Sequence, residues 1–282
     1  MTRSGFAAMI VGSGLALAQL AVLPAAADET AARQKALEPY FRNYRPSGAG
    51  PFPAILMVSG CSGFTPSIAP QVYTRAAERW RSKGYVVVFV DYLSARGLPN
   101  CSGSGAVNAV EIGRDVLAVA RYLQGQPYMK ASQISAVGWS LGGGAVLAAL
   151  GQLTTAENSP LLSVVAYYPY CRDLQPWQAK VPALSLMGAQ DEVAPPEVCQ
   201  RVFAQLPSGT ALQAHVYPEA RHGFDISDLP PYAKFGSETV GYNAAADAAA
   251  ARNTPSPVDG GGTLSSAFVV GAGTGAGALG ET

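Results

Sequence analysis

Short apolar runs and amphipathic stretches alternate along residues 28–253 of this 282-residue chain. The runs show almost no polar alternation, which is typical of parallel strands that are covered on both faces. We expect six strands, at Pro53–Ser59, Tyr85–Val90, Ile134–Val137, Leu162–Tyr167, Ala183–Met187 and Leu212–Tyr217. Helical spacing of apolar residues predicts helices at Gln71–Lys83, Gly105–Leu123, Leu141–Leu150 and Pro196–Gln205. Strands that alternate with helices predict an α/β fold with a doubly wound, mostly parallel sheet and helices on both faces.

The N-terminal segment departs from this pattern. A single basic residue, Arg3, precedes an uncharged apolar run at 6–23, and the small residues Ala25–Ala27 follow. This order is typical of a secretory signal peptide, with cleavage expected after Ala27. An uncleaved membrane anchor is the alternative, but two glycines within the run and its small-residue end favour cleavage. We therefore expect an exported protein, periplasmic or extracellular, with no stable membrane insertion after cleavage, because no later run is long enough to span a bilayer.

The C-terminal segment, residues 254–282, is the second exception. It is rich in glycine and proline and offers little to pack, which predicts a flexible tail. The chain therefore divides into a signal peptide at 1–27, one domain at 28–253 and a tail at 254–282.

Composition narrows the classes of function. The 19 basic and 19 acidic residues cancel, and removal of residues 1–27 takes away one basic residue and no acid, which leaves a charge of about −1. The chain therefore has no excess of basic residues, which argues against nucleic-acid binding. Four cysteines are too few for a disulfide scaffold, and their spacings match no zinc motif, so we expect no metal. In an oxidising compartment these four cysteines permit three disulfide pairings.

The strongest chemical signal is Gly138-Trp139-Ser140-Leu141-Gly142, a G-x-S-x-G sequence between a predicted strand and a predicted helix. In such a turn the nucleophile is held in a strained conformation, and side chains two residues before and after it would collide. We therefore expect Ser140 to be exposed at the helix N-terminus as a nucleophile. A plain glycine-rich turn is the alternative, and the strand and helix on either side favour the nucleophile.

A serine hydroxyl needs a base, and the chain contains two histidines. His215 lies within a predicted strand, which favours a structural role, whereas His222 follows that strand at the carboxyl edge of the sheet, where catalytic groups gather. An acid between Ser140 and His222 completes the usual order. Asp191 follows a predicted strand and is our choice; Glu192 is its rival and Asp173 a more distant alternative.

An oxyanion hole requires two backbone donors. Leu141 follows the nucleophile and supplies one. The second is expected from the loop Gly60-Cys61-Ser62-Gly63, where we prefer the N–H of Cys61 to that of Ser62; a plain turn is the alternative. Trp139 is a candidate wall of the substrate pocket, or a core residue beneath it.

An ordered set of motifs resembles the dienelactone hydrolase family of α/β-hydrolases over about residues 40–252. The motifs are Tyr44–Ala54, Gly60–Phe64, Asp91–Gly97, Gly138–Gly143 and Ala220–Phe224. The resemblance implies an α/β-hydrolase fold, no cofactor, and a triad at Ser140, Asp191 and His222. It also places Arg96 where dienelactone hydrolase itself contacts the substrate carboxylate; a surface salt bridge is the alternative for this residue.

The chain departs from that family pattern at three positions. Dienelactone hydrolases use cysteine where this chain has Ser140, carry an acid where it has Gly60, and have a second substrate arginine where Asp225 and Ile226 stand. Dienelactone is therefore a doubtful substrate, and an ordinary serine esterase arrangement is favoured. Family members also continue their last helix into an apolar segment, whereas here Ala244–Arg252 begins that helix and the tail follows.

With the resemblance in place, all four cysteines fall at the carboxyl edge of the sheet, close to the predicted site. We expect the disulfides Cys61–Cys101 and Cys171–Cys199, which would brace the loops that carry the oxyanion donor and Asp191.

These features predict a serine hydrolase that cleaves a carboxylic ester, lactone or related acyl bond through an acyl-enzyme. An acyltransferase or peptidase with the same triad, and a non-catalytic binding protein of the same fold, are the alternatives. The expected partner is a small acyl substrate, and the expected assembly is a monomer or small homo-oligomer.

Overall fold

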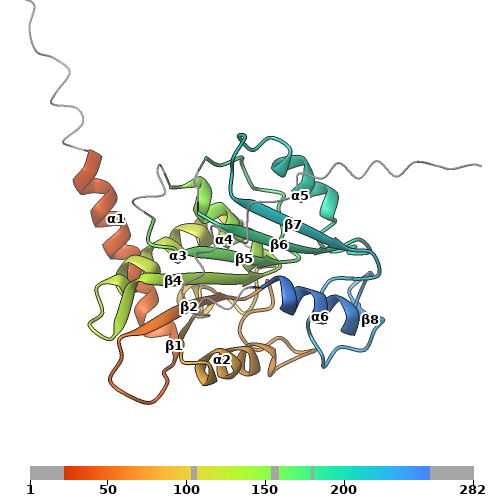
Figure 1. Cartoon of the computed structure of the whole chain (residues 1–282), viewed down its shortest axis with the longest axis horizontal. Coiled ribbons are helices and arrows are strands. Elements are labelled where there is room, and N and C mark those ends of the chain that lie inside the picture. Colours follow the sequence, from red (N-terminus) through yellow and green to blue (C-terminus); the bar gives the residue numbers. More distant parts are fainter. Residues whose placement is uncertain (1–21, 103–106, 154–158, 179–180, 255–282) are drawn as a thin grey trace, which may run out of the picture.

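A seven-stranded sheet runs through the middle of the protein in the order β1-β3-β2-β4-β5-β6-β7 (Figure 1). The structure is a computed structural model that describes residues 22–102, 107–153, 159–178 and 181–254. The strands are β1 (Phe41–Tyr44), β2 (Phe52–Val58), β3 (Val86–Val90), β4 (Met129–Trp139), β5 (Ser163–Tyr167), β6 (Ala183–Gly188) and β7 (Leu212–Tyr217). Only β1 pairs antiparallel, with β3; the other pairs in this sheet are parallel, which confirms the predicted fold class.

Helices cover both faces of the sheet (Figure 1). One face carries α3 (Ala109–Gln124), α4 (Leu141–Gly151) and α5 (Pro196–Phe203); the other carries α2 (Val72–Ser82) and α6 (Ala244–Asn253). The 3-10 turns η1 (Glu38–Tyr40) and η2 (Ser94–Arg96) lie in connections. Each layer buries its own core, because side chains that alternate along β2 and β3 point to opposite faces. Asparagine caps begin two of the helices: Asn108 accepts from Glu111 N–H at α3, and Asn243 accepts from Ala246 N–H at α6.

The remaining elements were not predicted. The helix α1 (Val22–Leu37) packs against α3, where Arg33 pairs with Asp115 at 2.8 Å. The strand β1 lies at the sheet edge, and its two central residues, Arg42 and Asn43, are polar and exposed, so it has no continuous apolar run. Two short strands, β8 (Ala233–Phe235) and β9 (Glu238–Val240), form a separate hairpin.

Several predicted boundaries shift. The strand β4 begins at Met129 rather than Ile134, because its first residues are mostly exposed and polar and give no apolar signal. The helix α3 is described from Ala109, and residues 103–106 of its predicted start lie outside the described residues. The predicted tail also lies outside them except for Thr254, as does the predicted signal peptide up to residue 21. Within the described ranges, no helix is long and apolar enough to cross a membrane.

Candidate active site

The turn between β4 and α4 holds Ser140 in a strained backbone conformation. Ser140 has φ 56° and ψ −118°, which is unusual for a residue with a side chain and costs about 1–3 kcal/mol. The surrounding backbone fixes it: Ser140 N–H donates to the Tyr167 carbonyl at 3.0 Å, and Ser140 carbonyl accepts from Tyr170 N–H at 2.9 Å. The turn therefore presents the hydroxyl at the N-terminus of α4, at the carboxyl edge of the sheet.

The turn requires glycine two residues before and two residues after Ser140, because backbone atoms of neighbouring segments leave no room for a side chain there. A Cβ at Gly138 would lie 2.1 Å from the Gly142 carbonyl oxygen. A Cβ at Gly142 would lie 2.3 Å from the Val58 carbonyl oxygen, so α4 begins against the end of β2. Any side chain at either position would push the nucleophile turn apart.

His222 and Asp191 form a hydrogen-bonded pair. The loop after β7 carries His222, and its Nδ1 lies 2.8 Å from Oδ2 of Asp191, which follows β6. The second carboxylate oxygen of Asp191 accepts from Val193 N–H at 2.9 Å and Ala194 N–H at 2.8 Å. Asp191 is 4% exposed, so the carboxylate is fixed in orientation and shielded from water.

The two rival acids do not reach His222. Glu192 is exposed; its carboxylate lies 3.5 Å from Arg221 and accepts from Thr239 N–H at 2.8 Å. Asp173 is also exposed and lies on the wall of the pocket. Of the three acids weighed from the sequence, only Asp191 is brought to the histidine. The other histidine, His215, is in β7 opposite Leu186.

One pocket contains both Ser140 and His222. Its volume is about 420 Å³, within the usual size of small-molecule sites. Leu141, Cys61 and Trp139 also line this pocket, so it gathers five of the predicted triad, oxyanion and substrate-contact residues.

The loop after β2 passes directly against Ser140. A Cβ at Gly60 would lie 3.1 Å from the Cβ of Ser140. Gly60 N–H already donates to the Tyr73 hydroxyl at 2.9 Å, and the Gly60 carbonyl accepts from the Tyr92 hydroxyl at 3.0 Å. Because Gly60 N–H is occupied, the next N–H in the loop, that of Cys61, is the candidate oxyanion donor. Leu141 is the first residue of α4, and the first N–H groups of a helix have no intrahelical acceptor.

Two disulfides brace the site from either side. They join Cys61 to Cys101 and Cys171 to Cys199, the two pairs expected from the sequence. The first holds the loop after β2 to the segment before α3, and Cys101 N–H donates to the Cys61 carbonyl at 3.0 Å. The second joins the loop after β5 to α5, the helix that follows Asp191.

Asp225, which sequence reasoning noted only as a departure from a family pattern, ties three segments of the site together. Its carboxylate accepts from Trp139 Nε1–H and from the Tyr168 hydroxyl, each at 2.7 Å. Burial raises the pKa of Asp225, and these two hydrogen bonds oppose the rise. The Tyr168 ring lies 4.5 Å from the His222 ring, centroid to centroid. Asp225 follows His222 by three residues, and that spacing was the only signal in the sequence.

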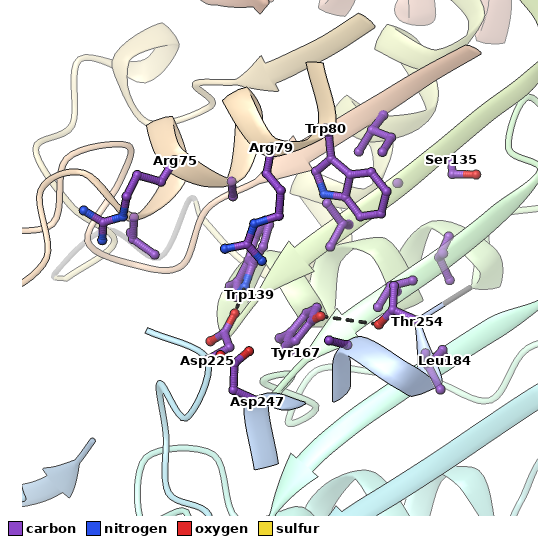
Figure 2. A pocket seen from close by; sticks show the side chains of 18 of the residues that line it. Arg75, Arg79, Trp80, Ser135, Trp139, Tyr167, Leu184, Asp225, Asp247 and Thr254 are labelled. Atoms are coloured by element: carbon purple, nitrogen blue, oxygen red, sulfur yellow. Dashed lines mark hydrogen bonds between the residues drawn. The ribbon is translucent and has the colours of Figure 1, made fainter. Parts of the chain in front are cut away.

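A second cavity, of about 170 Å³, lies on the other side of Trp139, between the sheet, α2 and α6 (Figure 2). Figure 2 shows Asp225 and Asp247 side by side there, with Arg79 above them and the Tyr167 hydroxyl directed at Thr254. Neither Ser140 nor His222 lines it, so it is separate from the candidate site.

Arg96, the predicted contact for a substrate carboxylate, is not brought to the pocket. Its guanidinium pairs with Asp115 at 2.8 Å and donates to the Tyr92 carbonyl at 2.9 Å. It lines a different, smaller hollow beside α1, together with Arg33. The reason is electrostatic: Asp115 is 1% exposed, and the guanidinium groups of Arg96 and Arg33 supply the opposite charge that stabilises this buried carboxylate. Among the described residues, no group of three or more His, Cys, Asp or Glu is arranged to hold a metal ion.

A parallel sheet with a strained serine turn and a histidine–aspartate pair at its carboxyl edge is the arrangement of an α/β-hydrolase. The sequence matches the dienelactone hydrolase family over residues 41–256, and the chain belongs to that family of hydrolases.

Solved structures share the fold at low sequence identity. A putative dienelactone hydrolase from Klebsiella pneumoniae is 19% identical, with a TM-score of 0.57 over 76% of this chain and 89% of that one. The dienelactone hydrolase-like promiscuous phosphotriesterase P91, from metagenomic libraries, is 18% identical, with a TM-score of 0.55 over 76% and 94%. No curated protein matches this sequence.

Proposed function

We propose that this protein is a serine hydrolase of carboxylic esters or lactones, with Ser140, His222 and Asp191 as its triad. The observation that carries the proposal is the 2.8 Å contact between His222 Nδ1 and the buried Asp191, in the same pocket as the strained Ser140. A histidine held this way presents its other nitrogen, Nε2, to the pocket. A histidine with only a structural role would not need this contact with Asp191, and a plain glycine-rich turn would not need the strained conformation of Ser140.

The expected reaction has two halves. Ser140 Oγ attacks the carbonyl carbon while His222 Nε2 takes its proton, and the oxyanion is stabilised by the N–H groups of Leu141 and Cys61. The tetrahedral intermediate collapses, the C–O bond to the alcohol breaks, and the alcohol leaves with the proton from His222. Water, deprotonated by His222, then attacks the acyl-enzyme; the bond between the acyl carbon and Ser140 Oγ breaks, His222 returns the proton to Ser140, and the acid is released. Asp191 holds the imidazole in the required tautomer and stabilises the imidazolium.

Turnover of p-nitrophenyl acetate, together with covalent labelling by a fluorophosphonate, tests this proposal. Ser140→Ala should abolish labelling and lower kcat by a factor of about 10⁴ or more. Ser208→Ala, at an exposed loop serine, is the matched control and should retain both. An unlabelled wild-type protein, or full activity in Ser140→Ala, would reject the serine mechanism.

We also propose export with cleavage after Ala27, supported by the N-terminal sequence pattern and by two disulfides near the site. Mass spectrometry of protein secreted or released from a bacterial host should give Asp28 as the first residue. An intact N-terminus in the cytoplasmic fraction would contradict this.

A further inference from the structure

We propose that the pocket selects neutral esters with an apolar acyl chain and discriminates against esters that carry a carboxylate. This inference names the substrate class of the proposed serine hydrolase and therefore rests on it. It follows from three observations: the apolar walls of the pocket, the sign of the charges that line it, and the position of Arg96.

The walls of the pocket above Ser140 are apolar and come from separate parts of the fold. Ile68 lies in the loop after β2, Ile226 and Leu229 lie in the loop after His222, and Phe235 and Val240 lie in the hairpin β8–β9. Two of them are well exposed: Ile68 is 44% exposed and Phe235 is 41% exposed. An alkyl chain that covered them would remove apolar surface from water, which favours binding.

The charge in the pocket has one sign. Among the described residues that line it, none is lysine or arginine, and the one carboxylate exposed on its wall is that of Asp173. The short segment 103–106, which follows Cys101 in the chain and precedes Val107, contains no charged residue in its sequence. A substrate carboxylate would therefore lose water without gaining a cationic partner, and Asp173 would repel it.

Arg96, the cation that the family resemblance places at a substrate carboxylate, is engaged elsewhere. Its guanidinium pairs with Asp115 at 2.8 Å, and Asp115 also pairs with Arg33 of α1 at 2.8 Å. Moving Arg96 toward the pocket would remove one of the two cations from a carboxylate that is 1% exposed, which is strongly unfavourable. Among the described residues, the pocket wall therefore offers no lysine or arginine that would bind an anionic substrate.

Two esters of equal chain length separate the alternatives. p-Nitrophenyl hexanoate and p-nitrophenyl hemiadipate have the same leaving group and six-carbon acyl chains, and only the second carries a terminal carboxylate. We expect kcat/KM for the hexanoate to exceed that for the hemiadipate by about tenfold or more, after subtraction of the rates without enzyme. The difference should shrink at high salt, because screening weakens the repulsion from Asp173.

Variants that change the pocket charge provide the second test. Ile68→Lys adds a cation at an exposed wall position and should raise kcat/KM for the hemiadipate about tenfold while lowering that for the hexanoate. Asp173→Asn removes the carboxylate and should raise hemiadipate turnover a few-fold. Glu78→Gln, at an exposed residue of α2 outside the pocket, is the matched control and should leave the ratio unchanged.

The outcomes separate this inference from the function on which it rests. Equal use of the two esters, or a preference for the hemiadipate, by an enzyme that labels at Ser140 would overturn the inference and leave the serine hydrolase intact. A protein that hydrolyses neither ester and does not label would overturn both. A preference for the hexanoate that Ile68→Lys reduces supports both.

Discussion

The carboxylate of Asp225 accepts a 2.7 Å hydrogen bond from the indole of Trp139, the residue that precedes Ser140. The same carboxylate accepts from the Tyr168 hydroxyl, and the Tyr168 ring packs on His222. One acid therefore links the nucleophile turn to the histidine loop without lining the catalytic pocket.

Asp225→Asn should lower both stability and activity. An amide accepts through one oxygen only, so either the indole N–H of Trp139 loses its acceptor or the Tyr168 hydroxyl loses its bond to a charged oxygen, at a cost of about 1–3 kcal/mol in the free energy of unfolding. We expect a lower kcat with little change in KM, because the loss disturbs the positions of Ser140 and His222 rather than the pocket walls. Denaturant titration and ester kinetics measure the two effects. Asp228→Asn, at an exposed acid paired with Arg75, is the control and should change stability by less than about 0.5 kcal/mol.

Asp191→Asn should lower kcat by a factor of about 10³–10⁴. The variant presents an amide N–H to His222 Nδ1, so the ring takes the tautomer whose Nε2 cannot accept the proton of Ser140. Glu192→Gln is the adjacent control and should retain most of the activity, because Glu192 is exposed and does not contact His222. Comparable losses in the two variants would argue against Asp191 as the triad acid. The kcat of each variant is measured by steady-state kinetics with p-nitrophenyl acetate.

Gly138→Ala and Gly142→Ala should both fail to give folded, active protein. The added Cβ would lie 2.1 Å and 2.3 Å, respectively, from backbone oxygens of other segments. Gly151→Ala, at the end of the same α4, is the control, because its Cβ would meet nothing closer than 4.0 Å. Soluble yield and circular dichroism provide the comparison. A soluble, active Gly138→Ala variant would show that the turn is looser than the structure indicates.

Alkaline unfolding should be driven by buried tyrosines. Burial raises the pKa of Tyr73, Tyr92 and Tyr167 above the ordinary value of 10.0. The unfolded chain releases these protons near pH 10.0 and the folded protein does not, so their stabilising effect is complete below pH 10 and is lost as pH rises toward the folded-state pKa. Each such tyrosine contributes a slope of up to about 1.4 kcal/mol per pH unit in this window.

Tyr167→Phe tests that slope with little loss of hydrogen bonding, because its hydroxyl makes a long contact of 3.4 Å with Thr254. The free energy of unfolding, measured by denaturant titration from pH 9 to 11.5, should fall less steeply in the variant than in the wild type. Parallel slopes would mean that Tyr167 titrates equally in both states.

The parts that could be predicted from the sequence depend on local pattern. The central strands β2, β3 and β6 are nearly uniform apolar runs, and the glycines of the G-x-S-x-G turn are required by local steric contacts. Both features can therefore be recognised from consecutive residues of the sequence. The edge strand β1 was missed because Arg42 and Asn43 are polar and exposed and interrupt its apolar pattern. The role of Asp225 was missed because its partners come from the ends of β4 and β5, and only the folded sheet brings them together. The ion pair of Arg96 could not be predicted for the same reason, since its partner Asp115 is on α3 and only the fold brings the two together.

The backbone of His222 also belongs to the ladder that forms the mouth of the pocket. It bridges to Val240, and its carbonyl accepts from Gly241 N–H at 2.9 Å, so the hairpin β8–β9 and the base are hydrogen-bonded to each other. Val240 and Phe235 of that hairpin line the pocket. In the proposed mechanism, the choice of substrate and the rate of proton transfer would therefore depend on the same hairpin. Exchange of this hairpin should alter both the substrate preference and the kcat of the proposed hydrolase.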